Sequence, residues 1–132
     1  MVKLYLDDER TPQNSNEWFI VRNFTDFKSW IKKYNLPDLI SFDHDLGPEH
    51  YEDLLSNENW SKDNKNIKLK YGEYNEKTGY HCLLWLIGFC LEMGYKLPEC
   101  KFHTFNPVGK RNMQQLYDNF TQMKEVHDGE SA

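Results

Sequence analysis

Two apolar runs of the sequence end directly in acidic residues. Residues 4–6 are followed by Asp7-Asp8, and residues 39–42 are followed by Asp43-His44-Asp45. A short apolar run bounded by turn residues is typical of a buried parallel strand. Ligands of open parallel sheets bind at the carboxyl ends of the strands. The sequence therefore predicts that both acidic segments lie at one edge of a sheet, where their side chains could do chemistry.

Three of these side chains, from Asp7, Asp8 and Asp43, are candidate metal ligands. Carboxylates gathered at one edge repel each other and raise their own pKa values unless a cation lies among them. Carboxylate oxygens suit Mg²⁺, which keeps several waters and commonly contacts substrate phosphates. We expect Mg²⁺, or Mn²⁺ in its place. The alternative is that each aspartate caps a following turn or helix, as aspartates often do.

The segment 106–112 (Asn-Pro-Val-Gly-Lys-Arg-Asn) is predicted to hold an anion. It leads from a strand into a helix, and the amides of a helix start bind anions, with Gly109 allowing close approach. Lys110 and Arg111 place positive charge in a first turn, where cations are unfavourable for the helix itself. Arg10 is a further candidate for bidentate phosphate contacts. The alternative for each cation is a solvated surface charge.

Two histidines, His44 and His103, each follow an apolar strand toward the same edge. Because imidazoles titrate near neutral pH, both are candidate general acids or bases. Asp45 is expected to orient His44 or a metal-bound water. The alternative is that either histidine is a hydrogen-bonded structural residue. The other histidines have weaker claims, and the histidines and cysteines lack the ligand spacing of a zinc site.

The elements that would position these residues alternate between strands and helices. Strands are predicted over 2–6, 18–22, 39–43 and 101–104, and helices are predicted to start near Thr25, at Thr78-Gly79 and after the fourth strand. This order indicates an α/β layered domain, with the second strand at an edge. Right-handed crossovers would bring the ends of strands one, three and four to one edge. That edge is expected to carry Asp7, Asp8, Asp43, His44, Asp45, His103 and Asn106.

The chain of 132 residues is long enough for one domain, which we expect over residues 1–125, with a flexible tail at 126–132. The polar segment 48–77 follows Asp-His-Asp directly. Long loops in compact domains are usually functional or disordered, and we interpret this one as a possible lid. Within it, 50–55 could form a helix and 67–71 a short strand.

Composition and charge indicate which partners and which cellular compartment to expect. The formal charge of -5 argues against a duplex DNA-binding surface. Three cysteines without CxxC spacing are consistent with buried thiols in a reducing compartment. The amino-terminal residues do not form a signal sequence, and no apolar stretch is long enough to span a bilayer. We expect a cytoplasmic protein without a membrane partner. The sequence does not indicate its oligomeric state.

Four motifs resemble those of one small family. They are Leu6-Asp7-Asp8-Glu9-Arg10-Thr11-Pro12, Ser41-Phe42-Asp43-His44-Asp45-Leu46-Gly47, Thr78-Gly79-Tyr80, and His103-Thr104-Phe105-Asn106-Pro107-Val108-Gly109 with Asn112-Met113. In this order, over about residues 2–120, they resemble the receiver-like group proposed to process cyclic phosphates, found in phages and bacteria beside RNA-repair genes.

The resemblance implies a receiver/flavodoxin-like three-layer fold with a reduced, mostly parallel four-stranded sheet. It also implies an acidic metal pocket and action on cyclic phosphate termini or related nucleotides. With the last motif, the candidate phosphate-binding residues become Arg10, Thr104, Asn106, Gly109, Lys110, Arg111 and Asn112.

The chain departs from true receivers in two places. In receivers, an aspartate after strand three accepts a phosphoryl group, and a lysine after a fifth strand contacts that group. Asp43 occupies the acceptor position, but only four strands are predicted and none carries such a lysine. Signalling through an aspartyl phosphate is therefore not favoured. His81 stands where an acidic residue is expected, which leaves one polar contact open.

We predict a metal-dependent phosphoesterase that opens a cyclic phosphate, on an RNA end or in a cyclic nucleotide. In this interpretation His103 or His44 protonates the leaving ribose oxygen. Two alternatives stay open. One is a module that binds or sequesters a nucleotide without turnover, and the other is a degenerate receiver that docks a protein partner.

Overall fold

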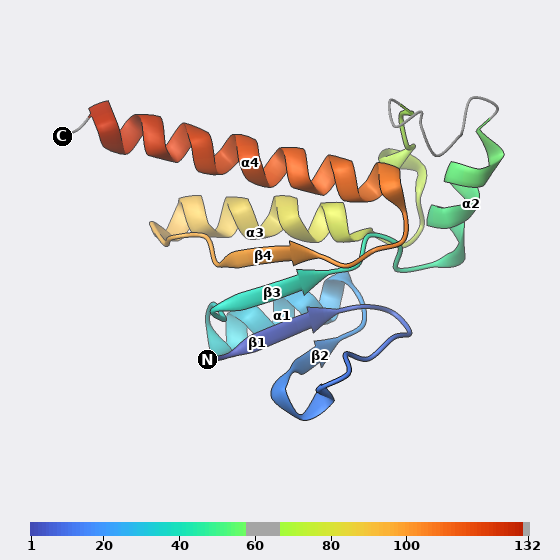
Figure 1. Cartoon of the computed structure of the whole chain (residues 1–132), viewed down its shortest axis with the longest axis horizontal. Helices are drawn as coiled ribbons and strands as arrows, with labels where there is room; N and C mark the ends of the chain where they lie inside the picture. The colour runs from blue at the N-terminus through green and yellow to red at the C-terminus, as the bar shows by residue number, and fades with distance from the viewer. Residues whose placement is uncertain (58–66, 131–132) are drawn as a thin grey trace.

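The computed structural model describes residues 1–57 and 67–130, with residues 123–130 described by their backbone alone. Its sheet has four parallel strands, β1 (Lys3–Leu6), β2 (Phe19–Val21), β3 (Leu39–Phe42) and β4 (Glu99–Phe102), in the order β2-β1-β3-β4. Figure 1 shows β1 and β3 in the centre of this sheet. The predicted α/β fold with a reduced four-stranded sheet is confirmed, and β2 lies at an edge as expected.

The fourth strand differs from its prediction. It was expected over 101–104 but covers Glu99–Phe102, because Glu99 N donates to Asp38 O (3.2 Å) and pairing with β3 begins there. His103 and Thr104 therefore follow the strand.

Three long helices pack around the sheet: α1 (Phe24–Tyr34), α3 (Gly79–Met93) and α4 (Pro107–Glu130). The core contains Leu4, Leu6, Ile40 and Phe42 from the strands, Phe27 and Ile31 from α1, and Leu83 and Leu86 from α3. α3 is apolar over most of its girth, which is typical of a buried helix. α4 lies along α3 and β4 (Figure 1) and contributes Met113 to the same core.

Side chains cap the starts of two helices, α1 and α3. α1 was predicted to start near Thr25, but its cap is Asn23, whose side chain accepts from Asp26 N (2.8 Å). Thr78 caps α3 in a capping box, in which His81 Nδ1 accepts from Thr78 N (2.9 Å). His81 thus makes the backbone contact that an acidic side chain usually makes at this position.

The segment 48–77 contains more regular structure than a polar loop. α2 (Pro48–Ser56) confirms the helix expected around 50–55, and Figure 1 shows it beyond the carboxyl ends of the strands. The strand expected over 67–71 is not formed. Residues 67–70 are irregular because Ile67 and Leu69 are buried against Leu54 and Val108, and a 3-10 helix (Tyr71–Glu73) follows. Residues 58–66 of the possible lid lie outside the described residues.

At its carboxyl end, α4 continues through residues 126–130, which the sequence assigned to a tail, and residues 131–132 lie outside the described residues. The flexibility of the tail stays a prediction. The thiols of Cys82 and Cys90 are buried, as expected. Within the described residues, no helix has the length and apolar character needed to cross a membrane.

Candidate functional site

Backbone hydrogen bonds continue the sheet past the ends of its strands. Asp7 N donates to Val21 O (3.1 Å), Asp43 N to Leu6 O (2.8 Å) and His103 N to Phe42 O (3.0 Å). The residues that follow β1, β3 and β4 are thereby held in register at the carboxyl edge. The predicted convergence of these strand ends is confirmed.

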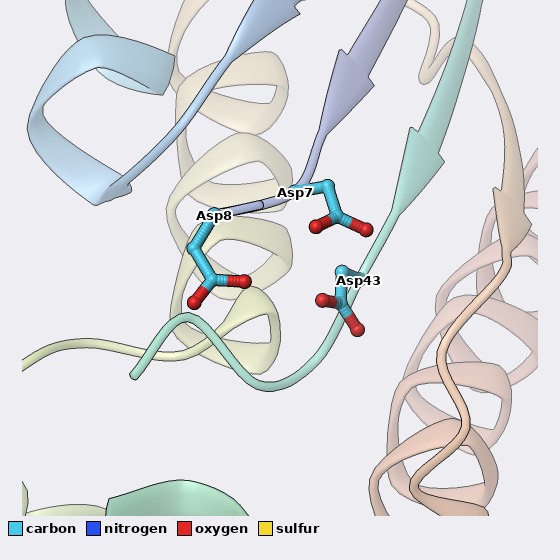
Figure 2. Close-up of side chains that lie close together, drawn as sticks. All are labelled: Asp7, Asp8 and Asp43. Carbon is cyan, nitrogen blue, oxygen red and sulfur yellow. The ribbon is translucent and has the colours of Figure 1, made fainter. Parts of the chain in front are cut away.

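The carboxylates of Asp7, Asp8 and Asp43 meet at this edge. One oxygen from each lies within 4.8 Å of the others, and Figure 2 shows the three side chains grouped beside the ends of β1 and β3. Asp7 and Asp43 are buried and Asp8 is half-buried. A compact set of carboxylate oxygens fits a hard divalent cation.

The pKa values of two of these acids reflect their crowding. Burial raises the pKa of Asp43 to about 6, although a hydrogen bond with the Thr104 side chain acts against it, and the charge of Asp7 adds to the rise. Burial also raises the pKa of Asp8, as do the charges of Asp7 and Glu9. Both carboxylates therefore resist ionisation where no cation compensates their charge.

Asp7 behaves differently because it accepts several hydrogen bonds. Burial acts to raise its pKa, but the amides of Arg10 (2.8 Å) and Glu9 (3.0 Å), together with His103 and the Arg10 charge, leave the pKa lowered. Asp7 Oδ1 thus caps the turn at 7–10, the alternative that the sequence left open. Its other oxygen, Oδ2, contacts the side chains of Arg10 and His103.

Arg10 lies among the acids. Its Nε is 3.0 Å from Asp7 Oδ2, its Nη2 is 3.5 Å from Asp43 Oδ1, and its guanidinium lies 4.4 Å from the centre of the Phe105 ring. Arg22 Nη1 donates to Asp7 O (3.1 Å) and Arg10 O (2.7 Å), which fixes the turn that carries Arg10. Arg10, the candidate for phosphate contacts, is therefore held next to the candidate metal ligands.

His103 supports Asp7. Its Nε2 lies 3.0 Å from Asp7 Oδ2 and its Nδ1 2.7 Å from Ser41 Oγ, and its ring stacks on Tyr5. Burial lowers the pKa of His103, although the hydrogen bond with Asp7 acts to raise it. The neutral ring donates from Nε2 to the carboxylate and accepts the Ser41 hydroxyl at Nδ1. Both nitrogens are occupied, so this geometry does not present His103 as the predicted general acid.

His44 is fully buried and also has both nitrogens occupied. Nδ1 lies 2.6 Å from Asp45 Oδ1, and Nε2 lies 2.8 Å from Tyr71 Oη. A Cβ added at Gly109 would collide with the His44 ring. The glycine therefore makes room for an imidazole and not for the anion that we predicted. His44 is the hydrogen-bonded structural histidine that the sequence left open.

The start of α4 is capped from within the chain. Asn106 Oδ1 accepts from Gly109 N (2.9 Å), Asn106 O accepts from Lys110 N (2.9 Å), and Pro107 has no N–H. Most of the amides that we expected to hold an anion are therefore already used. Asn106 Nδ2 donates to Asp45 Oδ1 (3.0 Å), which fixes Asp45 from a second side.

The acids at this edge line a cavity of about 500 Å³, which we call the rim pocket. Of the predicted site residues, it is lined by Asp7, Asp8, Asp43, Asp45, Arg10, Thr104 and Asn106. The other predicted residues do not line it: His44 and Gly109 are buried, and Lys110 is exposed. Arg111 and Asn112 line another cavity, and His103 reaches the rim pocket only through Asp7. Tyr51 and Phe105 line the rim pocket but were not predicted. Phe105 belongs to the motif at residues 103–109, and as a large apolar residue directly after the predicted strand 101–104 it could have been noticed.

The family model described as "Cyclic-phosphate processing Receiver domain" matches residues 2–119. No curated protein and no solved structure matches the chain.

Proposed function

The chain belongs to the cyclic-phosphate processing receiver domain family, and from this premise we propose that its rim pocket opens a cyclic phosphate with the help of a divalent cation. The observation that carries the proposal is the approach of three carboxylates to within 4.8 Å of one another at the carboxyl edge of a parallel sheet. The substrate would be a cyclic nucleotide or the 2′,3′-cyclic phosphate at an RNA end.

Asp7, Asp8 and Asp43 would hold the cation, Mg²⁺ or Mn²⁺. The donor set supports this assignment, because two of the three carboxylates have raised pKa values that a cation would lower again. When bound, the ion supplies Lewis-acid polarisation of a phosphoryl oxygen.

Arg10 would bind the phosphate. Its guanidinium already lies between Asp7 and Asp43, and its planar donors match two phosphate oxygens. The charge of a cation would weaken its attraction to the two carboxylates and favour contact with the substrate. Thr104, which also lines the pocket, offers a hydroxyl next to Asp43.

Asp45 would position the attacking water. Its Oδ1 accepts from Asn106 and is joined to His44, so the carboxylate is fixed at the pocket wall. A fixed carboxylate can orient a water and take its proton while the water oxygen bonds to phosphorus. The bond from phosphorus to one ribose oxygen then breaks, and that oxygen takes a proton from solvent. His103 acts through Asp7 and is a positioning residue in this account.

Two aromatic side chains favour a nucleotide over a simple phosphate ester. Phe105 is 80% exposed at the pocket and Tyr51 is 43% exposed. Exposed rings beside a phosphate site are platforms on which a nucleobase can stack.

The test is turnover of 2′,3′-cyclic AMP with Mg²⁺ or Mn²⁺, followed by phosphorus NMR of the monoester product. We expect turnover that EDTA abolishes and that Asp43→Asn lowers about a hundredfold or more. Asp118→Asn, which changes an exposed carboxylate on α4, is the matched control and should retain full activity. Turnover that persists in EDTA, or in Asp43→Asn, would refute the role of the cation.

A binding module without turnover is the second candidate. It is favoured by one observation: His44 and His103 have their ring nitrogens engaged by other side chains, so neither presents an evident general acid. Tight binding of a cyclic nucleotide that is returned intact would support this candidate over the first.

A further inference from the structure

A second cavity, of about 520 Å³, lies between α4 and residues 67–80, and we call it the α4 pocket. It is lined by Ile67, Lys68, Leu69, Tyr71, Tyr80, Arg111, Asn112, Gln115, Leu116 and Asn119. The buried His44 and its partner Tyr71 stand between this cavity and Asp45 of the rim pocket. The α4 pocket is therefore a separate site.

The charge of its lining indicates an anionic ligand. Among the residues that the structure describes, two of those lining the pocket, Lys68 and Arg111, are cations and none is acidic, in a chain whose net charge is -5. Lys68 is exposed, so its ammonium can reach a ligand without a conformational change in the backbone. Cations gathered where the rest of the molecule is acidic concentrate anions locally.

The rings of the α4 pocket favour a planar apolar group. Tyr71 and Tyr80 stack with ring centroids 4.7 Å apart, and both line the cavity with Leu69 and Leu116. Because the two rings already cover each other's facing surfaces, a nucleobase would lie against the outer side of this pair, beside the aliphatic side chains.

Amides along α4 supply polar contacts to the same space. Asn112, Gln115 and Asn119 recur at i, i+3 and i+7, so they share one face of the helix. Each carboxamide offers both donors and an acceptor, as the edges of nucleobases do. Gln115 and Asn119 are exposed residues of the pocket lining. The Nδ2 of Asn112 donates a hydrogen bond to Tyr71 Oη (2.9 Å).

We propose that the α4 pocket binds a nucleoside phosphate, with the base against the tyrosines and the helix amides and the phosphate at Lys68 and Arg111. The chemistry is shared by a free mononucleotide and by one nucleotide of a single-stranded RNA. This site does not depend on the cation or on the chemistry of the rim pocket.

The test is titration of the whole protein with 5′-AMP in EDTA, which silences any cation-dependent binding at the rim pocket. Lys68→Glu and Arg111→Glu should each weaken binding about tenfold or more, because a charge-assisted contact becomes a repulsion. Lys70→Glu and Lys110→Glu are matched controls: both residues are exposed neighbours outside the pocket lining and should bind as the wild type does.

Nitrogen-15 NMR locates the ligand in the same titration. The side-chain amide signals of Gln115 and Asn119 should shift with saturation. Binding that is equally strong for ribose 5-phosphate would remove the base from the proposal and overturn it. So would binding that Lys68→Glu and Arg111→Glu leave unchanged, or the absence of binding at millimolar 5′-AMP.

A short oligoadenylate distinguishes the two possible ligands, a free mononucleotide and a single-stranded RNA. Tighter binding of the oligonucleotide than of 5′-AMP, with the same dependence on Lys68, identifies RNA as the ligand, and equal binding identifies the mononucleotide. Asp43→Asn should leave all of these affinities unchanged. A failure of turnover at the rim pocket therefore does not affect this test.

Discussion

The rim pocket and the α4 pocket have nearly equal volumes and opposite charge. In the part of the chain that the structure describes, the first, of about 500 Å³, is lined by five acidic residues and one arginine, and the second, of about 520 Å³, by two cations and no acid. The rim pocket is made mainly where strands end, so its residues follow apolar runs in the sequence. The α4 pocket is made where an irregular segment packs on a helix face. The comparison shows that one small domain can carry an acidic pocket and a basic pocket side by side.

The wall between the pockets is a hydrogen-bonded chain. It runs from Asn112 through Tyr71 and His44 to Asp45, and every donor in it has an acceptor when His44 is neutral with its proton on Nδ1. Gly79 N donates to His44 O (2.8 Å), which holds the start of α3 against the same segment. Substitutions in this wall should affect both pockets, and substitutions outside it only one.

The largest effect is expected from Gly79→Ala. A Cβ at this position would collide with the backbone oxygen of Asp43, which cannot move without displacing the end of β3. We expect a loss of about 3 kcal/mol in the free energy of unfolding, measured by urea denaturation. Gly88→Ala in the same helix is the control, since its Cβ would meet nothing within 4 Å, and it should be neutral or stabilising. Equal stability of the two variants would contradict the described packing.

Asp43→Asn should change the rim pocket alone. The pKa of Asp43 is 3.8 in the unfolded chain and about 6 in the fold, so between these values the folded state binds more protons. In the absence of metal, stability due to this group therefore falls as the pH rises from about 4 to about 6 and stays reduced above that. Asparagine does not ionise, so it removes the free-energy cost of the buried charge. Its side-chain oxygen can still accept a hydrogen bond from the amide of His44.

In EDTA at pH 7.5, Asp43→Asn should accordingly be more stable than the wild type, by at most about 3 kcal/mol, and the difference should shrink toward pH 4. Thermal unfolding at several pH values measures it. A variant that is less stable than the wild type at pH 7.5, or a difference that does not depend on pH, would show that the ion pair with Arg10 compensates the buried charge of Asp43.

Tyr71→Phe tests the shared wall. The change removes the hydroxyl between His44 Nε2 and Asn112 Nδ2 and leaves a fully buried imidazole nitrogen without its partner. We expect a loss of about 1–3 kcal/mol in unfolding free energy. Tyr80→Phe is the control, because Tyr80 contacts Tyr71 through its ring. If both variants lost the same stability, the hydroxyl of Tyr71 would have no special role.

The smallest effect is expected from Phe105→Ala. This side chain is exposed and contacts Arg10 through its ring, so the fold should not depend on it. Affinity of the rim pocket for a 2′,3′-cyclic nucleotide should fall about tenfold, while affinity for inorganic phosphate should change little. Competition binding measures both. An equal loss for the two ligands would assign Phe105 to the placement of Arg10 and not to a nucleobase.

Much of the rim pocket could be predicted because its signals are local. Asp7 and Asp43 each end an apolar run, and the parallel topology that joins them follows from the order of strands and helices. The roles of His44 and His103 could not be separated in this way. Both follow strand ends, and only the packing of Gly109 on one ring and Ser41 beside the other shows where each side chain lies.

The sequence also did not predict that Lys110 lies apart from Arg111 and Asn112. These residues are neighbours in one turn, but successive positions of an α-helix point about 100° apart, so adjacent residues face different surroundings. Which face meets a cavity depends on the segment 67–80, whose burial of Ile67 and Leu69 overrides the strand-like pattern. The α4 pocket is therefore a tertiary feature without a local motif.

Calorimetric titration with Mg²⁺ and Mn²⁺ at pH 7.5 tests the central claim, that the three carboxylates form a cation site, most directly. We predict saturable binding in the wild type, its loss in Asp43→Asn, and its retention in Lys68→Glu, which alters only the α4 pocket. The absence of binding at millimolar metal, or equal binding by Asp43→Asn, would contradict the account.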